Sequence, residues 1–266
     1  MSIFKILVFV MLGNIVFGQD MGHNKSKNPI ILGEAIELQS DILNESRTLN
    51  IYLPAGYDEK NAETYPVIYL LDGGLDEDFI HIVGLVQFAS FSWINMIPPT
   101  IVVGIKNVDR KKDFTFPTTI AADLVDFPTT GFSENFISFI EQEVQPYIQT
   151  NYNTSGYKTI IGQSLGGLLA TEILFKKPDL FDRYIIVSPS LWWDNQSLLK
   201  IKRKPIANKS IFVAVGKEGK IMKNDAKALY KSLKPLKNIG FKYLKEQDHG
   251  DALHLAVYAA FEKFKK

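Results

Sequence analysis

Short apolar runs alternate with amphipathic segments along most of the chain. We predict eight strands, over Ile30–Leu38, Thr48–Leu53, Pro66–Leu71, Thr100–Ile105, Lys158–Ile161, Arg183–Val187, Ser210–Val215 and Phe241–Glu246. The later runs are β-branched and apolar at successive positions, which is typical of parallel strands buried on both faces.

Helical patterns separate these runs from Pro66 onward. We predict helices over Asp76–Phe88, Ser133–Gln149, Leu165–Lys177, Lys223–Leu236 and Ala252–Lys265. No helical pattern separates the first two strands, so we expect them to pair antiparallel. The alternation predicts an α/β fold with a mostly parallel, eight-stranded sheet and helices on both faces.

Two irregular segments are too long to be simple connections. One is Lys106–Gly131, which contains Arg110 and Asp113, and the other is Ser188–Lys209, which contains Trp192 and Trp193. Long segments of this kind in compact domains are usually functional or mobile.

The N-terminus has the pattern of a secretory signal peptide. Lys5 precedes an apolar run that ends near small Gly18, and polar residues follow. An uncleaved anchor helix is the alternative, but the run is short for a bilayer. We therefore expect a signal peptide over residues 1–18, a flexible connector over 19–29 and one domain over 30–266. The protein would be exported, to a periplasm or to the medium, with no stable membrane insertion after cleavage.

Composition excludes several classes of protein. The chain of 266 residues has no cysteine, which excludes disulfides, cysteine-based zinc sites and a cysteine nucleophile. A formal net charge of +1 gives no reason to expect a nucleic-acid partner. Residues 200–266 hold 17 Lys and Arg against 6 Asp and Glu. The lysines recur at helical spacing, which suits a solvated helix face, and attraction of an anionic substrate is the alternative.

Gly162-Gln163-Ser164-Leu165-Gly166 is a G-x-S-x-G motif between a predicted buried strand and a predicted helix. This strand–turn–helix setting is the one in which such a serine is a nucleophile. We expect Ser164 to attack, and the backbone N–H of Leu165 to stabilise the oxyanion. A second donor would come from Asp72-Gly73-Gly74, with Gly74 preferred to Gly73.

The nucleophile needs a base and an acid, in the chain order Ser, acid, His. His249 follows the last strand in a turn, whereas His254 falls inside the final predicted helix. We expect His249 to be the base. Glu218, just after the strand that ends at Val215, is preferred as the acid, and Asp225 is its rival.

Four segments together resemble the putative esterase family of α/β-hydrolases, from about Thr48 to the C-terminus. They are Tyr69-Leu70-Leu71-Asp72-Gly73, Gly162-Gln163-Ser164-Leu165-Gly166-Gly167, Ser188-Pro189-Ser190-Leu191-Trp192-Trp193 and Asp248-His249-Gly250. Ser-Leu-Trp-Trp and Asn107-Val108-Asp109-Arg110 are most similar to the siderophore-esterase branch, which acts on ferric enterobactin and salmochelin. The resemblance implies Ser164 as nucleophile, His249 as base and a carboxylate near Glu218.

The expected activity is hydrolysis of a small-molecule carboxylic ester through an acyl-enzyme, with no metal or other cofactor. Arg110 is a candidate substrate contact, or else a surface partner of Asp113. Trp192 and Trp193 either stack on an aromatic acyl group or fill space beside the sheet. A catecholate trilactone would suit these residues. Feruloyl or acetyl ester hydrolysis, acyl transfer and non-catalytic binding on the same fold are the alternatives, and the sequence does not predict an oligomeric state.

Overall fold

The computed structural model describes residues 28–265, and all of its helices and strands lie in the unit that begins at Leu32. The predicted signal peptide and nearly all of the predicted connector lie outside the described residues. No helix in the described part of the chain is long and apolar enough to cross a membrane.

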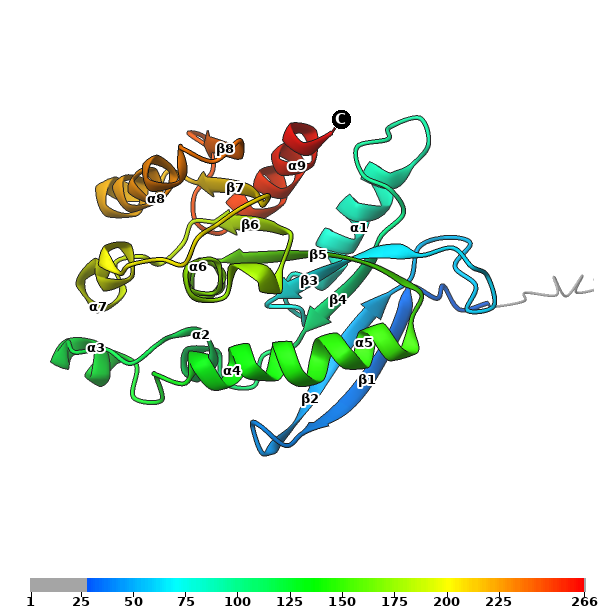
Figure 1. Ribbon diagram of the computed structural model, residues 1–266, viewed down its shortest axis with the longest axis horizontal. Helices are drawn as coiled ribbons and strands as arrows, with labels where there is room; N and C mark the ends of the chain where they lie inside the picture. The colour runs from blue at the N-terminus through cyan, green and yellow to red at the C-terminus, as the bar shows by residue number, and fades with distance from the viewer. Residues whose placement is uncertain (1–27, 266) are drawn as a thin grey trace, which may run out of the picture. The chain divides into compact units, whose positions relative to one another are not determined.

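One eight-stranded sheet organises this unit (Figure 1). Its strands are β1 (Gly33–Ser40), β2 (Glu45–Tyr52), β3 (Tyr65–Leu71), β4 (Ile101–Ile105), β5 (Thr154–Gln163), β6 (Arg183–Val187), β7 (Ser210–Val215) and β8 (Asn238–Tyr243). Their spatial order is β1-β2-β4-β3-β5-β6-β7-β8. The pairs β1–β2 and β2–β4 are antiparallel and the others are parallel, which confirms the predicted sheet.

Helices cover both faces of the sheet because side chains alternate along its strands. In β3, Ile68 and Leu70 belong to a core with α1 (Phe79–Ser90) and α9 (Ala252–Phe264). Val67, Tyr69 and Leu71, which alternate with them, belong to a second core. That core includes α4 (Ser133–Phe139), α5 (Gln145–Asn151), α6 (Leu165–Lys176) and α8 (Gly219–Leu233).

Some predicted boundaries differ from the structure. The predicted helix over Ser133–Gln149 is interrupted by a π-helical turn at Ile140–Val144, between α4 and α5. The last strand begins earlier than predicted, because Asn238 to Tyr243 pair residue by residue with Ser210 to Val215. Pairing with β7, which local sequence does not encode, sets the limits of β8.

The two long irregular segments pack against each other. The first contains α2 (Arg110–Phe114) and α3 (Ala121–Asp126), and the second contains the short turn α7 (Trp193–Gln196). Asp194 in α7 has a φ of 47°, and its carboxylate accepts hydrogen bonds from the backbone N–H and the hydroxyl of Thr119. These contacts join the two segments at the residue that follows Trp193.

Candidate active site

Ser164 lies at a sharp turn between β5 and α6. Its φ of 59° and ψ of −119° fall in a region that residues other than glycine rarely adopt. A Cβ atom added to Gly162 would lie 2.3 Å from the carbonyl oxygen of Gly166, so the turn requires glycine at this position. The predicted strand–turn–helix setting is confirmed.

Backbone hydrogen bonds hold the turn in place. The N–H of Ser164 donates to the carbonyl of Val187 at 3.0 Å, and its own carbonyl accepts from the N–H of Ser190 at 3.0 Å. Leu165 is the first residue of α6, where backbone N–H groups have no acceptor within the helix. Its amide therefore has the position that the predicted oxyanion role needs, and the role itself stays a prediction.

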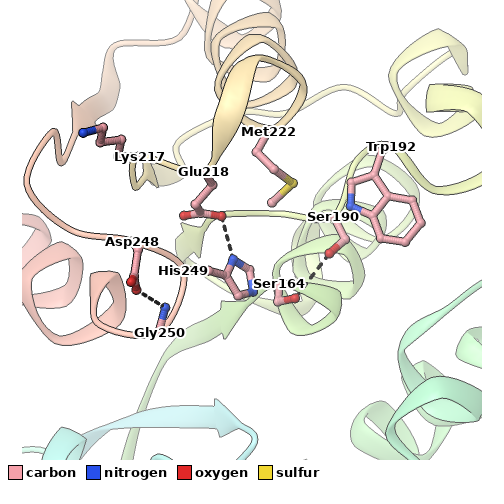
Figure 2. A pocket seen from close by; sticks show the side chains of 9 residues that line it. All are labelled: Ser164, Ser190, Trp192, Lys217, Glu218, Met222, Asp248, His249 and Gly250. Atoms are coloured by element: carbon pink, nitrogen blue, oxygen red, sulfur yellow. Dashed lines mark hydrogen bonds and ion pairs between the residues drawn. The ribbon is translucent and has the colours of Figure 1, made fainter.

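His249 and Glu218 form the second part of the site. Nδ1 of His249 lies 2.6 Å from Oε2 of Glu218 (Figure 2). The side chain of Glu218 is 5% exposed and that of His249 is 48% exposed. The other carboxylate oxygen of Glu218 accepts hydrogen bonds from the hydroxyl of Ser188 and from the N–H of Gly216.

These contacts shift the pKa values of both groups. Burial opposes the ionisation of Glu218, but hydrogen bonds from His249 and Ser188 outweigh it and hold the pKa of Glu218 below its usual value. The hydrogen bond to Glu218 raises the pKa of His249, against the opposing effect of burial. Glu218 thus remains a carboxylate that stabilises the imidazolium form of His249.

Ser164 and His249 line the same cavity, which has a volume of about 640 Å³. Figure 2 shows the imidazole ring between Glu218 and Ser164. Because Nδ1 is bonded to Glu218, Nε2 is the nitrogen free to take a proton from the serine. The hydroxyl of Ser190 lies 3.3 Å from that of Ser164.

The rival residues lie elsewhere. Asp225 is buried on α8, and burial raises its pKa. His254 is on α9, with its ring edge-on to that of His81 at a centroid distance of 6.2 Å. The structure therefore brings Ser164, His249 and Glu218 together and leaves both rivals out.

The predicted second oxyanion donors have other partners. The N–H of Gly73 donates to the carbonyl of Ile105 at 2.9 Å, and that of Gly74 donates to the carboxylate of Glu77 at 2.6 Å. Neither glycine is among the described residues that line the cavity. In this arrangement neither amide is a free oxyanion donor, because the turn after β3 folds Glu77 back onto Gly74.

Arg110 contacts the same loop. Its guanidinium donates to both carboxylate oxygens of Asp72, at 2.5 and 3.0 Å. The predicted alternative, a surface pair with Asp113, is wrong. Asp113 is fully buried and pairs with Arg47 of β2 at 2.8 Å, because α2 turns it toward the sheet. Arg110 does not line the cavity in the described structure.

The two tryptophans have different environments. Trp192 lines the cavity together with Met222 (Figure 2). Trp193 is fully buried, and its indole N–H donates to the carbonyl of Phe116 at 2.9 Å. Of the two predicted roles, contact with substrate is wrong for Trp193, and filling space beside the sheet agrees with its burial in the core.

The sequence analysis assigns no role to Ser188 or Ser190, although Ser188 contacts Glu218 and Ser190 contacts Ser164. Their position just after β6, at the carboxyl edge of a parallel sheet, is the signal that points to them. Among the described residues, no group of three or more His, Cys, Asp or Glu side chains is placed to hold a metal ion.

The sheet order and the nucleophile turn with its His–Glu pair define a serine hydrolase of the α/β-hydrolase fold. The family model described as "Putative esterase" matches residues 40–264, so the chain belongs to this family and is an esterase. The ferri-bacillibactin esterase BesA of Bacillus subtilis is 31% identical over 222 residues, which are 75% of this chain and 77% of that protein.

Solved structures agree with this assignment. An IroE-like serine hydrolase from Shewanella oneidensis superposes with a TM-score of 0.77 at 30% identity, over 86% of this chain and 79% of the other. The BES protein from Bacillus cereus has a TM-score of 0.77 at 27% identity, over 91% of this chain and 98% of the other.

Proposed function

We propose that this protein hydrolyses the ester bonds of siderophores through an acyl-enzyme on Ser164. The observation that carries the proposal is the placement of Ser164 and the His249–Glu218 pair in one open cavity. Relatives named as ferri-bacillibactin and triacetylfusarinine C esterases support the substrate class.

The geometry supports a two-step reaction. Nε2 of His249 accepts the proton of Ser164 as Oγ attacks the ester carbonyl, and the amide of Leu165 donates to the oxyanion. The imidazolium then gives its proton to the departing alkoxide, which leaves as an alcohol. Water, deprotonated by His249, attacks the acyl-enzyme and releases the acid and the free serine. Glu218 keeps Nε2 pointing at the nucleophile and stabilises the imidazolium.

Product analysis by mass spectrometry tests this proposal. Wild-type protein and Ser164→Ala are incubated with an iron-loaded catecholate trilactone and, separately, with a feruloylated oligosaccharide. We expect linearised trilactone from the wild type alone. If ferulate is the only product, the mechanism is retained and the proposal of a siderophore substrate is overturned. Absence of labelling of Ser164 by a fluorophosphonate would overturn the mechanism as well.

We also propose that the protein is exported, to a periplasm or to the medium. The basic start, short apolar run and small residue near Gly18 support this proposal. Expression in a bacterial host, cell fractionation and N-terminal sequencing test it. A mature N-terminus near Gln19 outside the cytoplasm is expected, and an intact N-terminus in the cytoplasm would contradict it.

A further inference from the structure

A second cavity, of about 480 Å³, adjoins the catalytic cavity. It is lined by Lys217, Gly219, Lys220, Lys223, Asn224, Lys227 and Tyr243, which we call the lysine groove. Lys217 lines both cavities, and Figure 2 shows its side chain extending away from Ser164. A bulky ligand with its reactive bond at Ser164 could therefore reach the lysine groove around Lys217.

The positive charge of this groove is not neutralised by neighbouring carboxylates. Lys220, Lys223 and Lys227 follow one another at spacings of three and four residues, so they share a face of α8. None of the four groove lysines forms an ion pair with a carboxylate of residues 28–265. Lysines elsewhere do form such pairs, as Lys176 does with Glu172.

Two features distinguish the groove from an ordinary solvated helix face. The ammonium of Lys223 lies 3.7 Å from the centroid of the Tyr243 ring, which holds it in place at the wall of the groove. Lysines on a helix face are stabilised by acidic residues three or four positions away and destabilised by other lysines at the same spacing. The only acidic residue within α8 is Asp225, which is buried. Several like charges gathered in one hollow repel one another, and an anion that binds there relieves the repulsion.

We propose that the lysine groove binds the anionic, non-reacting part of the ester substrate while the scissile carbonyl lies at Ser164. This inference rests on the proposed function and adds a subsite to it. The ligand chemistry is a compact polyanion, for which a ferric catecholate complex has the required charge. Ammonium groups on long side chains attract such a complex without requiring one fixed geometry.

A triple variant, Lys220→Gln with Lys223→Gln and Lys227→Gln, tests the groove. Lys217 is retained because it also lines the catalytic cavity. The matched control replaces three exposed lysines of equal total charge outside the groove: Lys231→Gln, Lys234→Gln and Lys237→Gln. Steady-state kinetics are measured on an iron-loaded catecholate trilactone and on neutral p-nitrophenyl acetate, at low and high salt.

We expect the groove variant to raise the KM for the anionic trilactone about tenfold relative to that for the neutral ester, and to weaken the salt dependence of this KM. The control triple variant should match the wild type on both substrates. Equal changes of KM in the groove and control variants would show that KM depends on the net charge of the protein rather than on the groove, and would overturn the proposal. So would an unchanged KM for the trilactone.

A binding measurement separates this proposal from the proposed function. Ferric tris-catecholate, which has no ester bond, is titrated into Ser164→Ala with and without the groove substitutions. Binding that weakens about tenfold with the groove substitutions supports the subsite even if the wild type fails to hydrolyse the trilactone. If the wild type hydrolyses the trilactone but binding of ferric tris-catecholate does not depend on these lysines, the proposed function is retained. The proposal that the lysine groove is a subsite is then overturned.

Discussion

Arg110 holds Asp72 through two hydrogen bonds, from Nε to one carboxylate oxygen at 2.5 Å and from Nη2 to the other at 3.0 Å. The same Nη2 donates to the carbonyl of Gln163 at 3.2 Å. One guanidinium therefore joins the loop after β3 to the residue that precedes the nucleophile. This geometry is that of a residue that positions the turn around Ser164.

Arg110→Lys should lower kcat about tenfold to a hundredfold on neutral and anionic esters alike, with little change in KM. A lysine cannot reproduce the forked contact with Asp72 while also reaching Gln163. Steady-state kinetics on both ester types measure this, with Arg203→Gln as a surface control. An increase in KM confined to anionic esters would instead make Arg110 a substrate contact.

Glu218→Gln should lower kcat/KM by about 10³-fold, because the imidazolium loses its stabilising carboxylate. The hydrogen bond to Glu218 raises the pKa of His249, so its loss lowers that pKa. Since only neutral His249 acts as a base, the acidic limb of the pH–rate profile should move to lower pH. The control is Asp225→Asn, whose profile should keep the wild-type midpoint; a shift there would reassign the acid.

Ser188→Ala should lower kcat/KM about three- to tenfold, because its hydroxyl donates to the carboxylate of Glu218. Ser40→Ala removes a comparable hydroxyl–carboxylate contact, to Glu143, at the far edge of the sheet. Activity and thermal unfolding are measured for both variants. Equal losses of activity would show that Ser188 acts through general stability rather than through Glu218.

Trp192→Ala and Trp193→Ala should affect different properties. Trp193 is fully buried and hydrogen-bonded, so its removal should cost about 3–5 kcal/mol in the free energy of unfolding. Trp192 lines the cavity, so its removal should raise KM about three- to tenfold with a smaller loss of stability. Urea unfolding and kinetics on aromatic and aliphatic acyl esters check both. A wild-type KM for Trp192→Ala would remove this residue from the substrate pocket.

Gly162→Ala should destabilise the protein by about 1–3 kcal/mol, since the new Cβ would meet the carbonyl of Gly166 at 2.3 Å. Gly84, exposed on α1, has no atom within 4 Å of an added Cβ. Gly84→Ala should stabilise by about 0.5–1 kcal/mol through helix propensity. Thermal unfolding of the two variants measures the contrast, and equal stabilities would refute the steric account of the nucleophile turn.

Local pattern was sufficient to predict much of the fold and the three side chains, Ser164, His249 and Glu218, that line one cavity. Strand and helix patterns repeat at short range, and the turn around Ser164 has a steric requirement that appears directly as a glycine at position 162. The chain order Ser, acid, His by itself favours an acid after the strand that ends at Val215 and a histidine after the last strand. These features depend on neighbours a few residues apart, so the sequence reveals them without tertiary information.

Long-range contacts decided the rest. Whether Arg110 pairs with Asp72 or Asp113, which of Trp192 and Trp193 enters the cavity, and whether Gly74 is a free donor all depend on how separate segments pack. The sequence by itself determined most of the strands and helices and the turn that carries Ser164, because backbone geometry is largely a local property. Only the tertiary structure decided the partners of each side chain, because hydrogen bonds and burial form between residues far apart in the chain.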